Sequence, residues 1–91
     1  MIDDLIKIGR SYKNKFTREY NLGAEHGIDS NLENEYLKWL SKIGKFVEIK
    51  LKSKFPNTTS QILNMVNKKS TYSIDYSIIM GYLESAKQFG Y

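Results

Sequence analysis

The fold is decided by residues 32–55, LENEYLKWLSKIGKFVEIKLKSKF. Apolar residues recur in this stretch every three or four positions, which is the spacing of one face of an α-helix. Lysines gather at its C-terminal end, where positive charge complements the helix dipole. The pattern stops at Phe55-Pro56, because proline disfavours helical geometry in the residue before it. We therefore predict a long helix over residues 30–54.

Three weaker patterns of the same period flank this stretch. They predict helices over residues 2–20, 58–67 and 73–89, joined by short links. Thr58 or Thr59 would cap the third of the four helices, because a threonine oxygen can accept a hydrogen bond from a free N–H of the first turn. The sequence shows no alternating strand pattern and no repeat of fixed period. We therefore expect an all-α fold, a compact bundle of about four helices.

Two connecting segments carry their own signals. Residues 21–30, NLGAEHGIDS, contain two glycines and several turn-forming residues but no periodicity, which predicts a loop. At its end Asp29 or Ser30 can cap the long helix, and Glu33 stands in the capping-box position relative to Ser30. Residues 71–74 leave a choice open. Their β-branched and aromatic residues could form a short strand instead of the start of a helix, although no partner strand is evident.

The composition is that of one small domain, residues 1–91. Of the 91 residues 41% are hydrophobic and 26% are charged, and one is proline. The chain lacks cysteine, which excludes disulfide scaffolds, thiol nucleophiles and cysteine-ligated zinc. No apolar run reaches the roughly 18 residues of a membrane span, and two aspartates precede the first apolar stretch, the reverse of a secretory signal. We expect a cytoplasmic protein.

Three glycines fall inside predicted helices, where glycine costs about 1 kcal/mol relative to alanine. Gly9 and Gly44 lie on the apolar faces of their helices. A glycine on a buried face lets another backbone or a ring approach closely, so we predict tight helix contacts at both positions. Replacing Gly44 with leucine should then destabilise the fold by about 1–3 kcal/mol. No such reason is apparent for Gly81.

The net charge of +4 hides an uneven distribution. Residues 38–69 carry eight lysines and one glutamate, about +7, while the segments on either side are slightly acidic. A basic stripe of this kind can neutralise the phosphates of a nucleic acid or meet an acidic protein surface, and on many helices it is only a solvated face. The lysine stripe on the long helix consists of Lys38, Lys42, Lys45 and Lys52.

Large apolar side chains are abundant for so short a chain. It contains one tryptophan, seven tyrosines and four phenylalanines, most of which belong in the core of a domain this small. Some are expected on an exposed face around the last helix, where apolar patches mark interfaces. This candidate apolar interface comprises Tyr72, Tyr76, Phe89 and Tyr91.

Residues that would carry catalysis are scarce. His26 is the only histidine, beside Glu25 and three residues before Asp29 in a polar loop, where a solvated side chain is the common case. The spacing from Arg18 to His26 is too long for the Arg–His pattern of HEPN-type ribonucleases. Helix-turn-helix readout is disfavoured, because the last helix opens with acidic and aromatic residues. No phosphate-binding glycine loop or metal motif occurs, so we expect no catalytic residues, metal or cofactor and no enzyme.

One motif of the long helix resembles a pattern found in known proteins. An acid is followed four residues later by tryptophan, then by an apolar turn and an aromatic-proline helix end. The residues are Glu35, Trp39, Ile43, Phe46, Val47, Phe55 and Pro56. In this the chain is similar, over about residues 1–66, to small helical N-terminal modules of bacterial defence and mobile-element, phage-type proteins. The resemblance implies an all-α module used for partner contact, and either a fragment of a longer protein or a free-standing protein that acts by binding.

Two functions remain open on the sequence alone. The first is a non-enzymatic module that binds another macromolecule, for which we expect a protein, as an inhibitor or adaptor; a homodimer is one form of that contact. The second is weak, salt-sensitive and non-sequence-specific binding of nucleic acid through the lysine stripe, since the chain has only two arginines for base readout. Neither involves a membrane.

Overall fold

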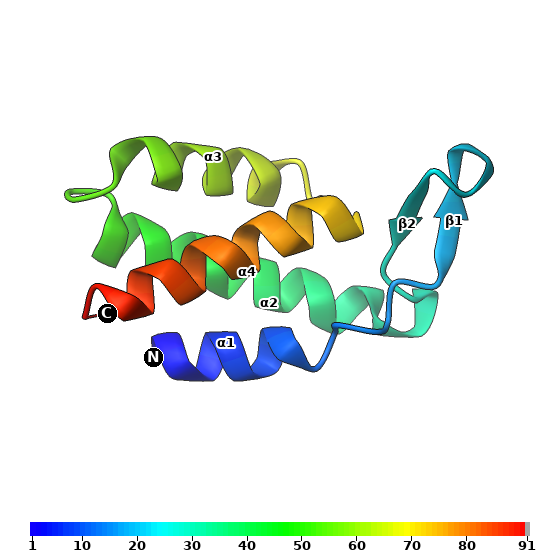
Figure 1. Ribbon diagram of the computed structural model, residues 1–91, viewed down its shortest axis with the longest axis horizontal. Helices are drawn as coiled ribbons and strands as arrows, with labels where there is room; N and C mark the ends of the chain where they lie inside the picture. Colours follow the sequence, from blue (N-terminus) through cyan, green and yellow to red (C-terminus); the bar gives the residue numbers. More distant parts are fainter. Residues whose placement is uncertain (91) are drawn as a thin grey trace.

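The computed structural model describes residues 1–90 and, within them, contains four α-helices and one small β-hairpin (Figure 1). A 3₁₀ turn at Ser30–Leu32 precedes the second helix, and a π-helical turn at Val47–Leu51 continues it. The predicted all-α bundle is confirmed. Its helices are α1 (Ile2–Arg10), α2 (Glu33–Phe46), α3 (Pro56–Asn67) and α4 (Ser73–Gln88).

Consecutive helices run in opposite directions and lie side by side (Figure 1). α1 contacts α2, α2 contacts α3, and α3 contacts α4, which also packs on α1 and so closes the bundle. The hairpin projects from one end of the long axis, which measures 39 Å (Figure 1). The start of α1 and the end of α4 meet at the opposite end, where Lys87 pairs with Asp3.

The core is built around an aromatic cluster between α1, α2 and α4. The indole N–H of Trp39 donates a hydrogen bond to the Leu5 carbonyl at 2.9 Å, and the Tyr76 hydroxyl donates to the Gly9 carbonyl at 2.7 Å. These bonds attach α1 to both of its neighbours. Ring centroids in the cluster lie 4.8–6.4 Å apart, within the range that aromatic pairs favour. The rings belong to Tyr12, Phe16, Tyr36, Trp39 and Tyr76.

Two of the helical glycines are buried at helix contacts, as predicted. A Cβ atom at Gly9 would overlap the sulfur of Met80 on α4 and lie 2.7 Å from Cζ2 of Trp39 on α2. At Gly44 the nearest atom would be Cγ1 of Val66 on α3, at 3.2 Å. The missing side chain of Gly9 therefore lets two neighbouring helices place large side chains directly against the α1 backbone.

The helix predicted over residues 2–20 is wrong beyond Arg10. Turns follow, and strand β1 (Arg18–Tyr20) then pairs antiparallel with strand β2 (Glu25–Gly27). Tyr20, which fits the helical spacing, lies in this hairpin and packs its ring on Tyr72 instead. The apolar spacing was misleading here. Residues in turns and strands can also place apolar side chains on the core at intervals of three or four positions, so the spacing alone does not show that the helix continues.

The loop predicted for residues 21–30 contains the second strand. The turn between the strands, Asn21–Gly23, places three successive residues at positive φ, of 51°, 56° and 89°. Asparagine and glycine tolerate this conformation better than other residues, which explains their place on either side of the exposed Leu22. A short Asn-x-Gly turn was the signal for the hairpin.

The hairpin attaches to the start of α4 through backbone contacts. Gly27 forms an isolated bridge with Tyr72, and the N–H of Ile28 donates to the Thr71 carbonyl at 2.9 Å. Residues 71–74 therefore do not form a strand, apart from the single bridge at Tyr72. α4 begins at Ser73, as predicted, and ends at Gln88, one residue before the predicted end.

Of the predicted N-terminal helix caps, one is confirmed and one is wrong. Asp29 caps the turn that leads into α2, since its carboxylate accepts from the N–H of Asn31 at 2.9 Å. This bond and one from the Thr17 hydroxyl hold the pKa of Asp29 below its ordinary value. The predicted threonine cap of α3 is wrong. The helix already starts at Pro56, which suits a first helical position, and Thr59 is buried inside it.

Candidate functional site

Two adjoining hollows lie between α1 and α2 on the outside of the bundle. They measure about 790 Å³ and 390 Å³ and share Asp4, Ile8 and Lys42 in their linings. We call the two together the basic groove. Its lining residues are Met1, Asp4, Leu5, Lys7, Ile8, Ser11 and Tyr12 from the α1 side, and Glu35, Lys38, Trp39, Lys42, Lys45, Phe46, Ile49 and Lys50 from the α2 side.

Most of the predicted lysine stripe lines this groove, but Lys52 does not. Lys52 borders a separate hollow beside α3. The displacement follows from the π-helical turn at Val47–Leu51, which takes more residues per turn than an α-helix and so shifts the residues after it around the axis. Lys50 lines the groove instead. The stripe residues that reach it are Lys38, Lys42 and Lys45.

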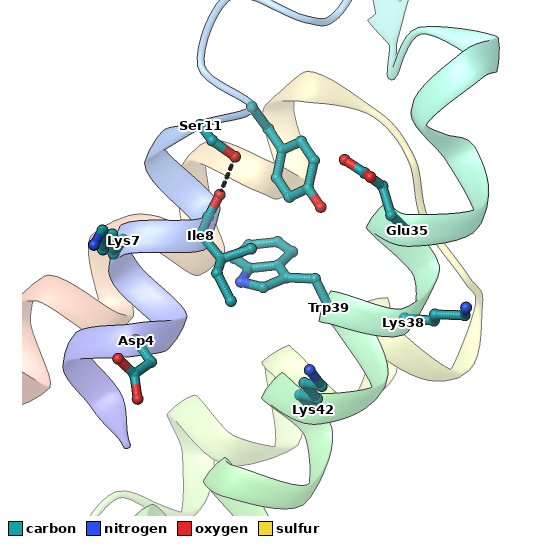
Figure 2. A pocket seen from close by; sticks show the side chains of 9 residues that line it. Asp4, Lys7, Ile8, Ser11, Glu35, Lys38, Trp39 and Lys42 are labelled. Atoms are coloured by element: carbon teal, nitrogen blue, oxygen red, sulfur yellow. Dashed lines mark hydrogen bonds between the residues drawn. The ribbon is translucent and has the colours of Figure 1, made fainter.

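Apolar side chains are exposed along the groove. Ile8 of α1 and Trp39 of α2 lie toward one another in the wider hollow, with Lys38 and Lys42 on the α2 rim (Figure 2). In the narrower hollow, Met1 and Ile49 are 76% and 75% exposed, and Ile8 is 38% exposed. These exposed apolar side chains therefore lie in one hollow together with lysines.

The charges of the groove are unbalanced. Five lysines face two carboxylates, Asp4 and Glu35, which gives the lining a net charge of +3. In residues 1–90 no ion pair joins α1 to α2, and none of these five lysines forms one. The groove therefore presents basic groups that the described chain does not neutralise.

Tyr12 closes the end of the groove near the aromatic cluster. Burial raises the pKa of the Tyr12 hydroxyl, and the neighbouring Glu35 carboxylate raises it further. The hydroxyl therefore stays neutral at physiological pH. At this end the groove offers a hydrogen-bonding group and a carboxylate, whereas the end near Ile49 is mainly apolar and basic.

The candidate apolar interface is not one surface. Tyr76 is only 7% exposed and donates its hydroxyl bond inside the core, so its place in the interface is wrong. Tyr72 and Phe89 are exposed, but they lie before and after α4, at opposite ends of it. Tyr91 lies outside the described residues.

The exposed residues at the two ends of α4 also have partners inside the chain. The ring of Tyr72 contacts Tyr20 at a centroid distance of 5.3 Å, and that of Phe89 contacts Phe55 at 5.9 Å. The apolar residues that α4 exposes between them are Ile74 and Ile78, which the sequence reading did not single out.

His26 lies on β2 opposite Glu19, with 4.0 Å between its Nε2 atom and the carboxylate oxygen. Its side chain is 43% exposed. Among residues 1–90 no group of three or more histidine, aspartate or glutamate side chains is placed to hold a metal ion. The arrangement around His26 is that of a cross-strand surface pair.

The α1 side of the groove and Ile49 were not predicted from the sequence. Ile8 and Ile49 were detectable, because each is apolar while a residue four positions before it in its helix, Asp4 or Lys45, is charged. An isolated apolar residue on a polar helix face is the available signal. That Met1 and Lys7 join them could not be seen, because it depends on how α1 lies along α2.

No protein-family model, curated protein or solved structure matches this chain. The similarity to modules of defence and mobile-element proteins therefore stays a prediction. None of the helices in residues 1–90 combines the length and the apolar content that crossing a bilayer requires.

Proposed function

We propose that this protein is a non-enzymatic module that binds another protein through the basic groove. The observation that carries the proposal is the joint exposure of Met1, Ile8 and Ile49 in one groove. Apolar side chains that gather in a hollow and are rimmed by charge mark interaction sites. Because lysines supply most of that rim, the contacting surface of the partner is expected to be acidic.

Nucleic acid is the second candidate ligand, favoured by the alignment of Lys38, Lys42 and Lys45 along one rim. Phosphate binding needs the lysines but gives no role to exposed isoleucines. The displacement of Lys52 to another side also shortens the row of charges that a nucleic acid backbone could follow. A protein accounts for both the apolar and the basic groups of the groove.

Site-specific photo-crosslinking tests the proposal. A benzophenone amino acid replaces Ile49 in the groove or, as a matched control, Ile78 on the exposed face of α4, and the full chain is irradiated in extracts of its host. We expect a covalent adduct from position 49, absent from position 78, that resists nuclease and is digested by protease. No adduct, or equal adducts at both positions, would overturn the proposal. A nuclease-sensitive adduct would favour nucleic acid.

Three variants separate the two ligands further. Ile49→Ala removes apolar surface without changing charge, and the double variant Lys42→Glu, Lys45→Glu reverses charge. A protein ligand should lose affinity with both changes, whereas a nucleic acid should lose affinity only with the second. Lys13→Glu with Lys68→Glu is the control, because it changes the net charge equally at exposed positions outside the groove.

A further inference from the structure

We infer that the ligand of the basic groove is an amphipathic, acidic α-helix of the partner protein, about four turns long. The inference rests on the proposed function above and adds the chemical class and the shape of the partner. It follows from the length of the groove, from its apolar groups and from its uncompensated charge.

The shape of the groove fits a helix. It runs between two antiparallel helices, and on the α2 side it extends from Glu35 to Lys50, about 20 Å at the roughly 1.5 Å rise of a helical residue. The ridge of a third helix packs naturally into the space between two others. An added β-strand would need a free sheet edge, and neither hairpin strand lines the groove.

The apolar groups set the pattern that the ligand must carry. Ile8 lies near the middle of the groove, where the two hollows meet, and Met1 and Ile49 lie at one end. A helix laid along them contacts the groove with every third or fourth residue, so its apolar side chains should recur at i, i+3 or i+4, and i+7. These side chains would cover surface that is now exposed to water.

The charges of the groove determine that the ligand helix should carry a net negative charge. Lys42, Lys45 and Lys50 surround the apolar end without an ion pair in the described chain, and Asp4 is the one carboxylate there. Carboxylates of a ligand helix that flank its apolar stripe would be placed against these lysines. Opposite charge at the rim also directs the encounter of the two proteins.

A second copy of this chain is the weaker choice of occupant. Two copies carry a net charge of +4 each. The face with Ile74 and Ile78 belongs to α4, whose carboxylates, Asp75 and Glu84, already bond to Ser70 and Arg10 of the same chain. Self-association is therefore an outcome that the test must be able to reveal.

Peptide display on the folded 91-residue chain tests the inference. The probe is a library of random 16-residue peptides, selected on the immobilised protein and then measured individually by fluorescence anisotropy. We expect enriched peptides with net negative charge and apolar residues at helical spacing, which become helical on binding as seen by circular dichroism. Ile49→Asp should weaken their binding at least about tenfold, while the control Ile78→Asp should leave it unchanged.

The outcomes separate the inference from the proposed function. Enriched peptides that are basic, that lack helical spacing or that bind Ile49→Asp as well as the parent chain would overturn the helical ligand, as would the absence of any enrichment. If a protein still crosslinks to position 49 in that case, the proposed function stands without this inference. Sedimentation of the free chain as a dimer that Ile49→Asp dissociates would instead identify the occupant as a second copy.

Discussion

The two flanks of α1 differ in how they meet their neighbours. Toward α4, the contact is closed by Met80 against Gly9 and by two ion pairs on the outer side, Lys87 with Asp3 at 2.6 Å and Arg10 with Glu84 at 3.6 Å. We call this the α1–α4 seam. Toward α2, Trp39 closes the inner side, where it lies against Gly9 and donates to the Leu5 carbonyl, but the outer side remains open as the basic groove.

The difference is one of charge pattern more than of packing. In the seam, each helix contributes one acidic and one basic side chain, and each of them pairs with the opposite charge on the other helix. In the groove, five lysines outnumber two carboxylates, Asp4 of α1 and Glu35 of α2, and none of these lysines forms an ion pair within residues 1–90. A helix contact whose charges are already paired needs no further partner, whereas one that keeps apolar groups and like charges on its outer side is suited to bind an acidic ligand.

A substitution at Gly9, in the α1–α4 seam, should destabilise the protein more than any other change considered. Gly9→Leu should lower the free energy of unfolding by about 3 kcal/mol, because the new side chain must displace both Met80 and Trp39. Gly44→Leu should cost less, since a Cβ atom there would lie 3.2 Å from Cγ1 of Val66 and 3.8 Å from Cδ2 of Leu63, without the overlap found at Gly9. Urea unfolding of each variant measures the difference.

Gly81→Leu is the matched control, because a Cβ atom there would meet nothing within 4 Å. It should leave the free energy of unfolding unchanged or raise it by up to about 1 kcal/mol through helix propensity. Equal losses at Gly9 and Gly81 would show that α1 is not packed as closely as described.

Two buried tyrosines should respond differently to loss of their hydroxyl groups. Tyr76→Phe removes the hydrogen bond to Gly9 and should cost about 1 kcal/mol. Tyr36→Phe should cost nothing or stabilise the protein, because the buried hydroxyl of Tyr36 has no hydrogen-bond partner among the described residues. Thermal unfolding of the two variants tests the contrast, and a larger loss for Tyr36→Phe would contradict it.

Tyr36 should also make the free energy of unfolding depend on pH, by a smaller amount. Burial raises the pKa of Tyr36 well above its ordinary value, so above about pH 10 the unfolded chain loses a proton that the folded chain keeps. The free energy of unfolding therefore falls as the pH rises through this range. In Tyr36→Phe the fall between pH 8 and pH 11 should be shallower than in the parent chain. Identical pH profiles would mean that the hydroxyl is not buried.

The smallest effect is expected at the ion pairs of the seam, which are exposed to solvent. The Lys87 ammonium holds the pKa of the Asp3 carboxyl below its ordinary value, and Lys87→Met should return it toward that value. A carboxyl-detected NMR titration follows this change. Ligand binding at the groove should be unaffected, and a loss of affinity would show that the seam and the groove are not independent.

Most of the helical framework was predictable, because the long amphipathic stretch and the helices around it keep the helical period, but the first helix ends at Arg10 and not at residue 20. Asp29 marks the entry to α2, whereas α3 starts at Pro56, two residues before its predicted start at residue 58. The hairpin was not predictable from period alone. Its strands are three residues each, and they are fixed by contacts with Tyr72 and Thr71, far away in the sequence.

The site was predictable only in part, for a related reason. Lys38, Lys42 and Lys45 follow from ordinary helical spacing. Lys52 was misplaced because a π-helical turn, which no residue pattern announces, changes the phase of the helix before it. The α1 side of the groove depends on the packing of two helices, so the sequence could suggest Ile8 as unusual without showing what it faces.

An NMR map of the bound surface shows directly whether the basic groove is where the ligand binds. The ¹⁵N-labelled full chain is titrated with the most tightly binding peptide from the display selection, and amide shift changes are compared between the groove and α4. We expect the largest changes at residues 4–8 and 42–50, with residues 74–85 on the exposed side of α4 unchanged. Shift changes centred on α4 or on the hairpin, or none at the groove, would contradict this expectation.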